Sequence, residues 1–231
     1  HIWLELLRQS TDEDGRQQPG KAFKKLQKKV TSDLLARAFL PGYPFATPMC
    51  QHPTVLCRKR WDTYFCLDWD RGTALDIERW MSSVRRAAPH LAPKVIAAVV
   101  RLGFHGWPTS HRCGTAKKCF MCGDYSDSVR HICRCSVSRR WFEHLGLAPV
   151  GQYSPRLFFL AIRGHDDLFV AKTALGVFAI YDLLNNLRNS HSKPASDIIL
   201  QLHFHLVRGG EGGKAHLARW ARGCRPPYAS S

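Results

Sequence analysis

Cysteine and histidine side chains gather in one short stretch of this chain. Five of the nine cysteines fall within 23 residues, and the densest part reads C-x2-C, eight residues, then H-x3-C. Zinc prefers four thiolate or imidazole donors in a tetrahedron, and C-x2-C brings two thiolates to one ion from a single tight turn. The spacing therefore predicts a Zn²⁺ site with the ligands Cys119, Cys122, His131 and Cys135.

Cys133 competes with Cys135 for the place of the fourth ligand. On a helix that begins near Ser128, His131 and Cys135 are four residues apart and share a face, whereas Cys133 points away. We therefore expect Cys135 to be the ligand. Gly123 follows the first cysteine pair, where a knuckle of this type commonly needs a positive φ angle.

A disulfide, or a few buried free thiols, is the alternative interpretation of these cysteines. A chain of 231 residues can bury a substantial core without disulfides. An odd number of cysteines among histidines and basic residues also fits a reducing compartment better than a secreted scaffold. The cysteines at positions 50, 57 and 66 contain no C-x2-C pair, so we expect buried thiols there.

Charge points to an anionic partner. Lys and Arg number 34 against 18 Asp and Glu, which gives a net charge of +16 and a pI near 9.8. Such a balance favours nucleic acid as partner, with a merely soluble basic surface as the alternative.

Lys172 and Asp182 interrupt the longest apolar stretch, and no signal peptide is recognisable, so we expect an intracellular, nuclear protein without a membrane partner. Because the chain begins at His1 without Met, we expect a piece or a processed product of a longer protein, of unknown oligomeric state.

The apolar periodicity predicts a mainly α fold, a helical domain around a small CCHC zinc knuckle with an irregular N-terminal segment. Helices are expected over 20–40, 73–86, 93–103, 137–145, 157–162, 167–189 and 194–207. The expected domains are a basic helix and irregular segment (1–72), a helical hairpin (73–110), the knuckle (111–147), a helical region (148–208) and a flexible basic tail (209–231).

Two groups of cations could contact phosphate, although a charged face is often simply solvated. The first lies on one face of the helix expected over 20–40 and comprises Lys24, Lys25, Lys28 and Lys29. The second surrounds the knuckle and comprises Arg112, Lys117, Lys118, Arg130, Arg134, Arg139 and Arg140.

The stretch from Gly106 to about Leu147 resembles the zinc knuckle of reverse transcriptases from non-LTR retrotransposons, the C-terminal region that follows their polymerase domain. That family tends to show a G-W-x-T-[SA]-x-R lead, C-x2-C-G, an acidic-[ST]-[IV]-x-H element, x3-C and an aromatic-rich helix. The corresponding parts here are 106–112, 119–123, 127–131, Cys135 and Trp141 with Phe142.

The resemblance implies a region that binds template RNA or target DNA in a protein that as a whole is an RNA-directed DNA polymerase. Departures from the family limit the implied activity. The Tyr/Phe-Ala-Asp-Asp polymerase motif is absent, and the stretch 193–197 only partly matches the nuclease that often follows the knuckle. We therefore expect a non-catalytic, zinc-stabilised nucleic-acid-binding fragment. Two alternatives are a structural zinc module that docks to an acidic protein and, less favoured because four protein ligands leave no place for water, a catalytic zinc site.

Overall fold

The computed structural model of the chain describes residues 73–110, 117–124, 126–190 and 197–225, together with Cys57, Arg58 and Trp61. All of them belong to the unit that spans Gln51–Ser231. The predicted mainly helical fold around a Cys/His cluster is confirmed, and no strand occurs within the described ranges. The helix expected over 20–40 lies outside the described residues, and the predicted domain boundaries up to 208 stay predictions.

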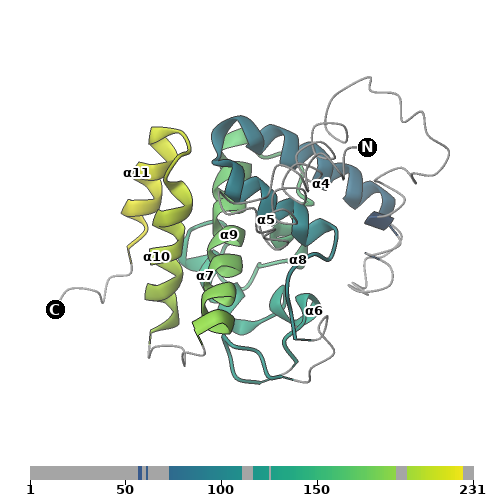
Figure 1. Cartoon of the computed structure of the whole chain (residues 1–231). Coiled ribbons are helices and arrows are strands. Elements are labelled where there is room, and N and C mark those ends of the chain that lie inside the picture. Colours follow the sequence, from purple (N-terminus) through teal and green to yellow (C-terminus); the bar gives the residue numbers. More distant parts are fainter. Residues whose placement is uncertain are drawn as a thin grey trace, which may run out of the picture. The chain divides into compact units, whose positions relative to one another are not determined.

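Figure 1 shows how the helices are arranged. In chain order they are α4 (Thr73–Ala87), the 3₁₀ turn η2 (Ala88–His90), α5 (Pro93–Gly103), α6 (Val129–Ile132), α7 (Ser136–His144), α8 (Pro155–Phe158), α9 (Asp167–Ser190), α10 (Ile198–Gly210) and α11 (Ala215–Gly223).

Helix α9 is the centre around which the others pack. It contacts α4, α5, α7, α8 and α10, and Figure 1 shows it between α10 and α5. Its buried side chains lie on nearly every face, from Val170 to Leu187, as expected for a helix with neighbours on several sides. The predicted cap is present, because the Asp166 carboxylate accepts a hydrogen bond from the Phe169 amide at 2.6 Å.

The knuckle region reaches this core mainly through α7. Trp141 is fully buried, and its indole N–H donates to the Gly176 carbonyl of α9 at 3.1 Å. A buried indole commonly needs such an acceptor. Trp107, which precedes the knuckle, is anchored in the same way by a 2.9 Å hydrogen bond to the Ala98 carbonyl of α5.

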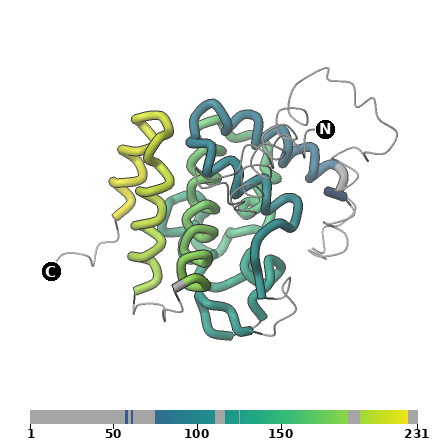
Figure 2. Tube along the Cα trace, viewed as in Figure 1, coloured from purple at the N-terminus to yellow at the C-terminus, as the bar shows by residue number. Residues whose placement is uncertain are grey.

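The glycine-rich stretch that was predicted to open a flexible tail is instead the end of α10 and the short turn that leads into α11. Gly209 and Gly210 complete α10, and α11 follows beside it, as the tube of Figure 2 shows. A Cβ on Gly209 would lie 2.6 Å from the Phe178 ring of α9, so the missing side chain permits close helix packing. The prediction of a flexible basic tail over 209–231 is therefore wrong up to Arg225, since glycine here serves contact rather than mobility.

Two other helices differ from their predicted extents. The helix expected over 157–162 covers Pro155–Phe158 only, and the chain then turns through Leu160, whose φ is 54° and whose side chain is fully buried. Burial of Leu160 evidently outweighs the helical periodicity. Helix α10 begins after Asp197, whose carboxylate accepts from the amides of Ile199 and Leu200 at 3.0 and 3.1 Å. Among the described residues no helix has both the length and the apolar character needed to cross a membrane.

Candidate metal centre

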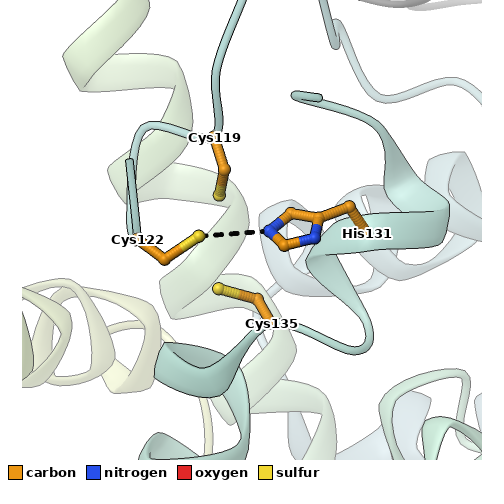
Figure 3. A group of neighbouring side chains, drawn as sticks. All are labelled: Cys119, Cys122, His131 and Cys135. Carbon is orange, nitrogen blue, oxygen red and sulfur yellow. Dashed lines mark hydrogen bonds between the residues drawn. The ribbon is translucent and has the colours of Figure 1, made fainter. Parts of the chain in front are cut away.

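Four side chains from the predicted zinc motif meet in space. The donor atoms of Cys119, Cys122, His131 and Cys135 all lie within 4.8 Å of one another, and Cys122 Sγ is 3.3 Å from His131 Nε2. Figure 3 shows the four side chains pointing toward a common centre. Metal bonds of about 2.3 Å to sulfur and 2.0 Å to nitrogen place donor atoms about 3.5 to 3.8 Å apart in a tetrahedron. The cluster could therefore hold one metal ion.

The first two donors come from a tight turn. The Gly123 amide donates to the Cys119 carbonyl at 2.9 Å, which closes the loop that carries both thiols. Gly123 has a φ of 77°, as predicted, and this left-handed conformation favours glycine. An isolated antiparallel bridge between Lys118 and Ser126 joins the two arms of the turn.

Of the last two donors, His131 lies in α6 and Cys135 lies just before α7, contrary to the prediction that they share one face of a helix. Helix α6 begins after Ser128, whose hydroxyl accepts from the His131 amide at 3.2 Å, and it ends at Ile132. The chain then turns, and Cys135 is the residue that precedes α7. The prediction that Cys135 is the fourth ligand agrees with the cluster. However, Cys135 reaches the cluster because the chain turns between α6 and α7, and not because it lies four residues after His131 on one helix.

Cys133 lies away from the cluster. Its thiol is fully buried and hydrogen-bonds the Arg130 carbonyl at 3.2 Å. Burial raises the pKa of this thiol to about 12, so it carries its proton at neutral pH. A protonated thiol that is already bonded to a carbonyl is a packing residue, as the sequence predicted.

The thiols of the cluster differ in acidity before any metal binds. Cys119 hydrogen-bonds Cys135, and this contact together with burial raises the pKa of Cys119 far above its ordinary value. The same hydrogen bond lowers the pKa of Cys135, helped by the amides of Val137 and Ser138 at the start of α7, although burial opposes it. Burial lowers the pKa of His131 and favours the neutral ring that a metal ligand needs.

Contacts outside the cluster hold the knuckle on the helical core. The buried Asp127 carboxylate pairs with Arg188 of α9 at 2.7 Å and accepts from the Ser110 amide at 2.8 Å. Arg188 also lies over the Phe120 ring, 5.6 Å from its centroid. The Tyr153 hydroxyl donates to the Cys133 carbonyl at 2.7 Å. Sequence reasoning missed these anchors because Arg188 and Tyr153 carry no motif of their own.

Most of the predicted cations of the knuckle are exposed. Arg112 lies outside the described residues, as do Lys24, Lys25, Lys28 and Lys29. The exposed members are Lys117, Lys118, Arg130, Arg134, Arg139 and Arg140. Three of them, Arg130, Arg134 and Arg139, line a pocket of about 680 Å³ on the side of the cluster where Cys122 and His131 are partly exposed.

The aromatic side chains of the knuckle do not form an exposed platform. Trp107 and Trp141 are fully buried, and Phe120 is partly covered and lies beside Arg188. Tyr125 lies outside the described residues. Stacking of nucleic-acid bases needs an accessible ring face, which the two tryptophans do not provide.

Comparisons of the chain with protein-family models, with curated proteins and with solved structures find no match. Its function is therefore inferred from the geometry and chemistry of its own residues.

Proposed function

We propose that this chain is a non-catalytic nucleic-acid-binding module whose knuckle is stabilised by a structural Zn²⁺ ion. The observation that carries the proposal is the concentration of exposed cations on the segments that the Cys/His cluster joins. Lys117 and Lys118 precede Cys119, Arg130 precedes His131, and Arg134 precedes Cys135. A metal bound to these ligands holds the cations in one fixed arrangement, which favours contact with successive phosphates.

Zinc suits the donors better than other common ions. Three thiolates and one imidazole form a soft tetrahedral set, whereas Mg²⁺ and Ca²⁺ require oxygen ligands. Four protein donors complete the coordination and leave no position for a reactive water, which argues for a structural role. The resemblance of residues 106–147 to retrotransposon knuckles supports the same proposal and adds that the longer protein is an RNA-directed DNA polymerase.

Phosphate contact, rather than base stacking, provides the binding energy in this proposal, because Trp107 and Trp141 are buried. Each guanidinium or ammonium that neutralises a phosphate releases counterions, so affinity must fall steeply with salt. The slope of log affinity against log salt is about 0.7 per contact for single strands and about 0.9 for duplex DNA.

The test is fluorescence anisotropy of the zinc-loaded full chain with labelled RNA and duplex DNA over a salt series. We expect binding with a slope of at least about 3, and loss of affinity when Arg130, Arg134 and Arg139 are changed together to Gln. No detectable binding at about 50 mM salt would contradict the proposal. Equally tight binding of an acidic polypeptide of the same charge would instead favour the protein-docking alternative.

A further inference from the structure

The pocket beside the metal cluster is lined by two of the proposed ligands, Cys122 and His131, together with charged and hydroxyl side chains. Of the residues that the structure describes, Arg130, Arg134 and Arg139 are its basic members and Asp124 supplies its one carboxylate. Three serine hydroxyls complete the polar wall, from Ser126, Ser128 and Ser136. Among the described residues, the ring of His131 is the only aromatic group that lines it, so these residues offer donors and acceptors but little surface for a base.

The guanidinium groups come from three separate backbone segments. Arg130 is in α6, Arg134 is in the turn that follows, and Arg139 is in the first turns of α7. Within the described ranges no ion pair engages Arg130 or Arg139. Planar guanidinium groups of residues that line one concavity can match the oxygens of a phosphate, which each can bind through two parallel hydrogen bonds.

Asp124 does not fit a pocket for phosphate alone, because a carboxylate repels an anion. A carboxylate can only accept hydrogen bonds. Beside three arginines that bind a phosphate, it is therefore suited to accept a hydrogen bond from a hydroxyl group on the sugar that carries this phosphate. A ribose supplies such a donor at its 2′ position, next to the 3′ phosphate, and deoxyribose does not. The volume of about 680 Å³ is within the range of ordinary small-ligand sites.

We propose that this pocket binds a ribose-phosphate unit of an RNA strand, with the phosphate on Arg130, Arg134 and Arg139 and the 2′-hydroxyl on Asp124. The inference rests on the proposed function and deepens it. It states that the chain binds RNA more tightly than DNA, and that the contact is made in this pocket rather than over the whole basic surface. Bases are not read there, so recognition is independent of sequence.

The arginines could have another role, to neutralise the cluster itself. A divalent ion with three thiolates and a neutral imidazole leaves a net charge of −1 beside the pocket. If the arginines only offset that charge, their loss should lower the zinc content of the chain and leave RNA preference unchanged. Metal content per chain therefore accompanies every binding measurement.

The first test compares two neighbouring arginines of α7. Arg139 lines the pocket, whereas Arg140, which is also exposed, does not. With the zinc-loaded full chain and labelled oligo(rU), Arg139→Gln should weaken binding about tenfold and Arg140→Gln less than about threefold. Equal losses would show a diffuse basic surface and overturn the pocket, although the proposed function would stand.

The second test measures the ratio of affinities for oligo(rU) and oligo(dU) of the same length. We expect a ratio of about five to ten in the unmodified chain and close to one in Asp124→Ala. Removing an acid strengthens binding to both strands, but that effect cancels in the ratio. Glu78→Ala, which removes an exposed carboxylate of α4 away from the pocket, should leave the ratio unchanged.

Besides equal losses in the two arginine variants, three results would overturn the inference. One is a ratio of one in the unmodified chain, and another is a ratio that Asp124→Ala does not alter. The third is loss of zinc in Arg139→Gln, because that arginine would then serve the metal centre. Failure of both oligonucleotides to bind at about 50 mM salt would also defeat the proposed function, so the two failures are distinguishable.

Discussion

The guanidinium group of Arg188, near the end of α9, hydrogen-bonds both carboxylate oxygens of Asp127 in the knuckle. The Nη2 atom lies 2.7 Å from Oδ1 and 2.9 Å from Oδ2, and Nε lies 3.2 Å from Oδ2. The Asp127 side chain is fully buried and that of Arg188 is 15% exposed. A pair this well enclosed ties the start of α6, the helix that carries His131, to the helical core.

Removal of the arginine should therefore cost much more than removal of a surface partner. Arg188→Met leaves a buried carboxylate without its counter-charge, and we expect the free energy of unfolding to fall by about 3 kcal/mol. The matched control is Arg86→Met, which breaks an exposed pair with Asp167 and should cost less than about 1 kcal/mol. Urea unfolding of both variants measures the difference.

A second change separates the charge from the packing. In the double variant Arg188→Met with Asp127→Asn the buried group is neutral, so part of the lost stability should return. If Arg188→Met is no more destabilising than Arg86→Met, the pair does not anchor the knuckle.

The cysteines allow a direct test of the metal ligands. Cys119→Ser removes one of the four donors and should reduce bound zinc to well below one ion per chain and lower the temperature of unfolding. Cys133→Ala changes a fully buried thiol two residues from a ligand, yet it should keep its zinc because that thiol bonds the Arg130 carbonyl. The measurement is the zinc content per chain of the two purified variants after dialysis. Retention of zinc by Cys119→Ser together with its loss from Cys133→Ala would reverse the ligand assignment.

Local patterns predicted the parts of this fold that depend on neighbours in the chain. The four donors, the cap at Asp166 and the start of α5 at Pro93 all follow from short-range chemistry. The pair between Asp127 and Arg188 joins residues 61 positions apart, so no local pattern could indicate it.

Two of the wrong predictions have a common cause in tertiary packing. The glycines at 209–213 indicated a flexible linker, but two of them permit close helix packing: Gly209 lets α10 approach α9, and Gly210 lets it approach α11. The helix after Pro155 stopped early because Leu160 turns into the core. The extents of these helices depend on which of them pack against one another, and amino-acid composition does not contain that information.

The glycine contact leads to a third prediction. In Gly209→Ala the new methyl group would lie 2.6 Å from Phe178 Cδ1, so the Phe178 ring or the helix backbones must shift, and we expect a loss of about 1 to 3 kcal/mol. In Gly223→Ala, at the end of α11, a Cβ meets nothing within 4 Å, and alanine should be neutral or stabilise by up to about 1 kcal/mol. Thermal or urea unfolding of the two variants provides the comparison. A stabilising Gly209→Ala would show that α10 does not pack closely on α9.

The last prediction concerns acid. Asp182 of α9 hydrogen-bonds the buried His205 of α10, with 2.8 Å between Oδ2 and Nδ1. Burial alone would raise the pKa of Asp182, but the contact with His205 and the charges of Arg208 and Lys94 outweigh it and lower the pKa. A folded pKa below the unfolded value means that the ionised carboxylate stabilises the fold above about pH 4, and that this contribution is lost as the pH falls through the folded pKa.

Asp182→Asn should consequently cost about 1 kcal/mol at pH 7 and progressively less toward pH 3. Loss of metal in acid affects both proteins, so the informative quantity is the difference in unfolding free energy between them at each pH. Glu78→Gln, an exposed carboxylate on α4, should show no such trend. A difference that grows toward low pH would mean that Asp182 is stabilised in its protonated form, and the pair with His205 would then not hold α10 against α9.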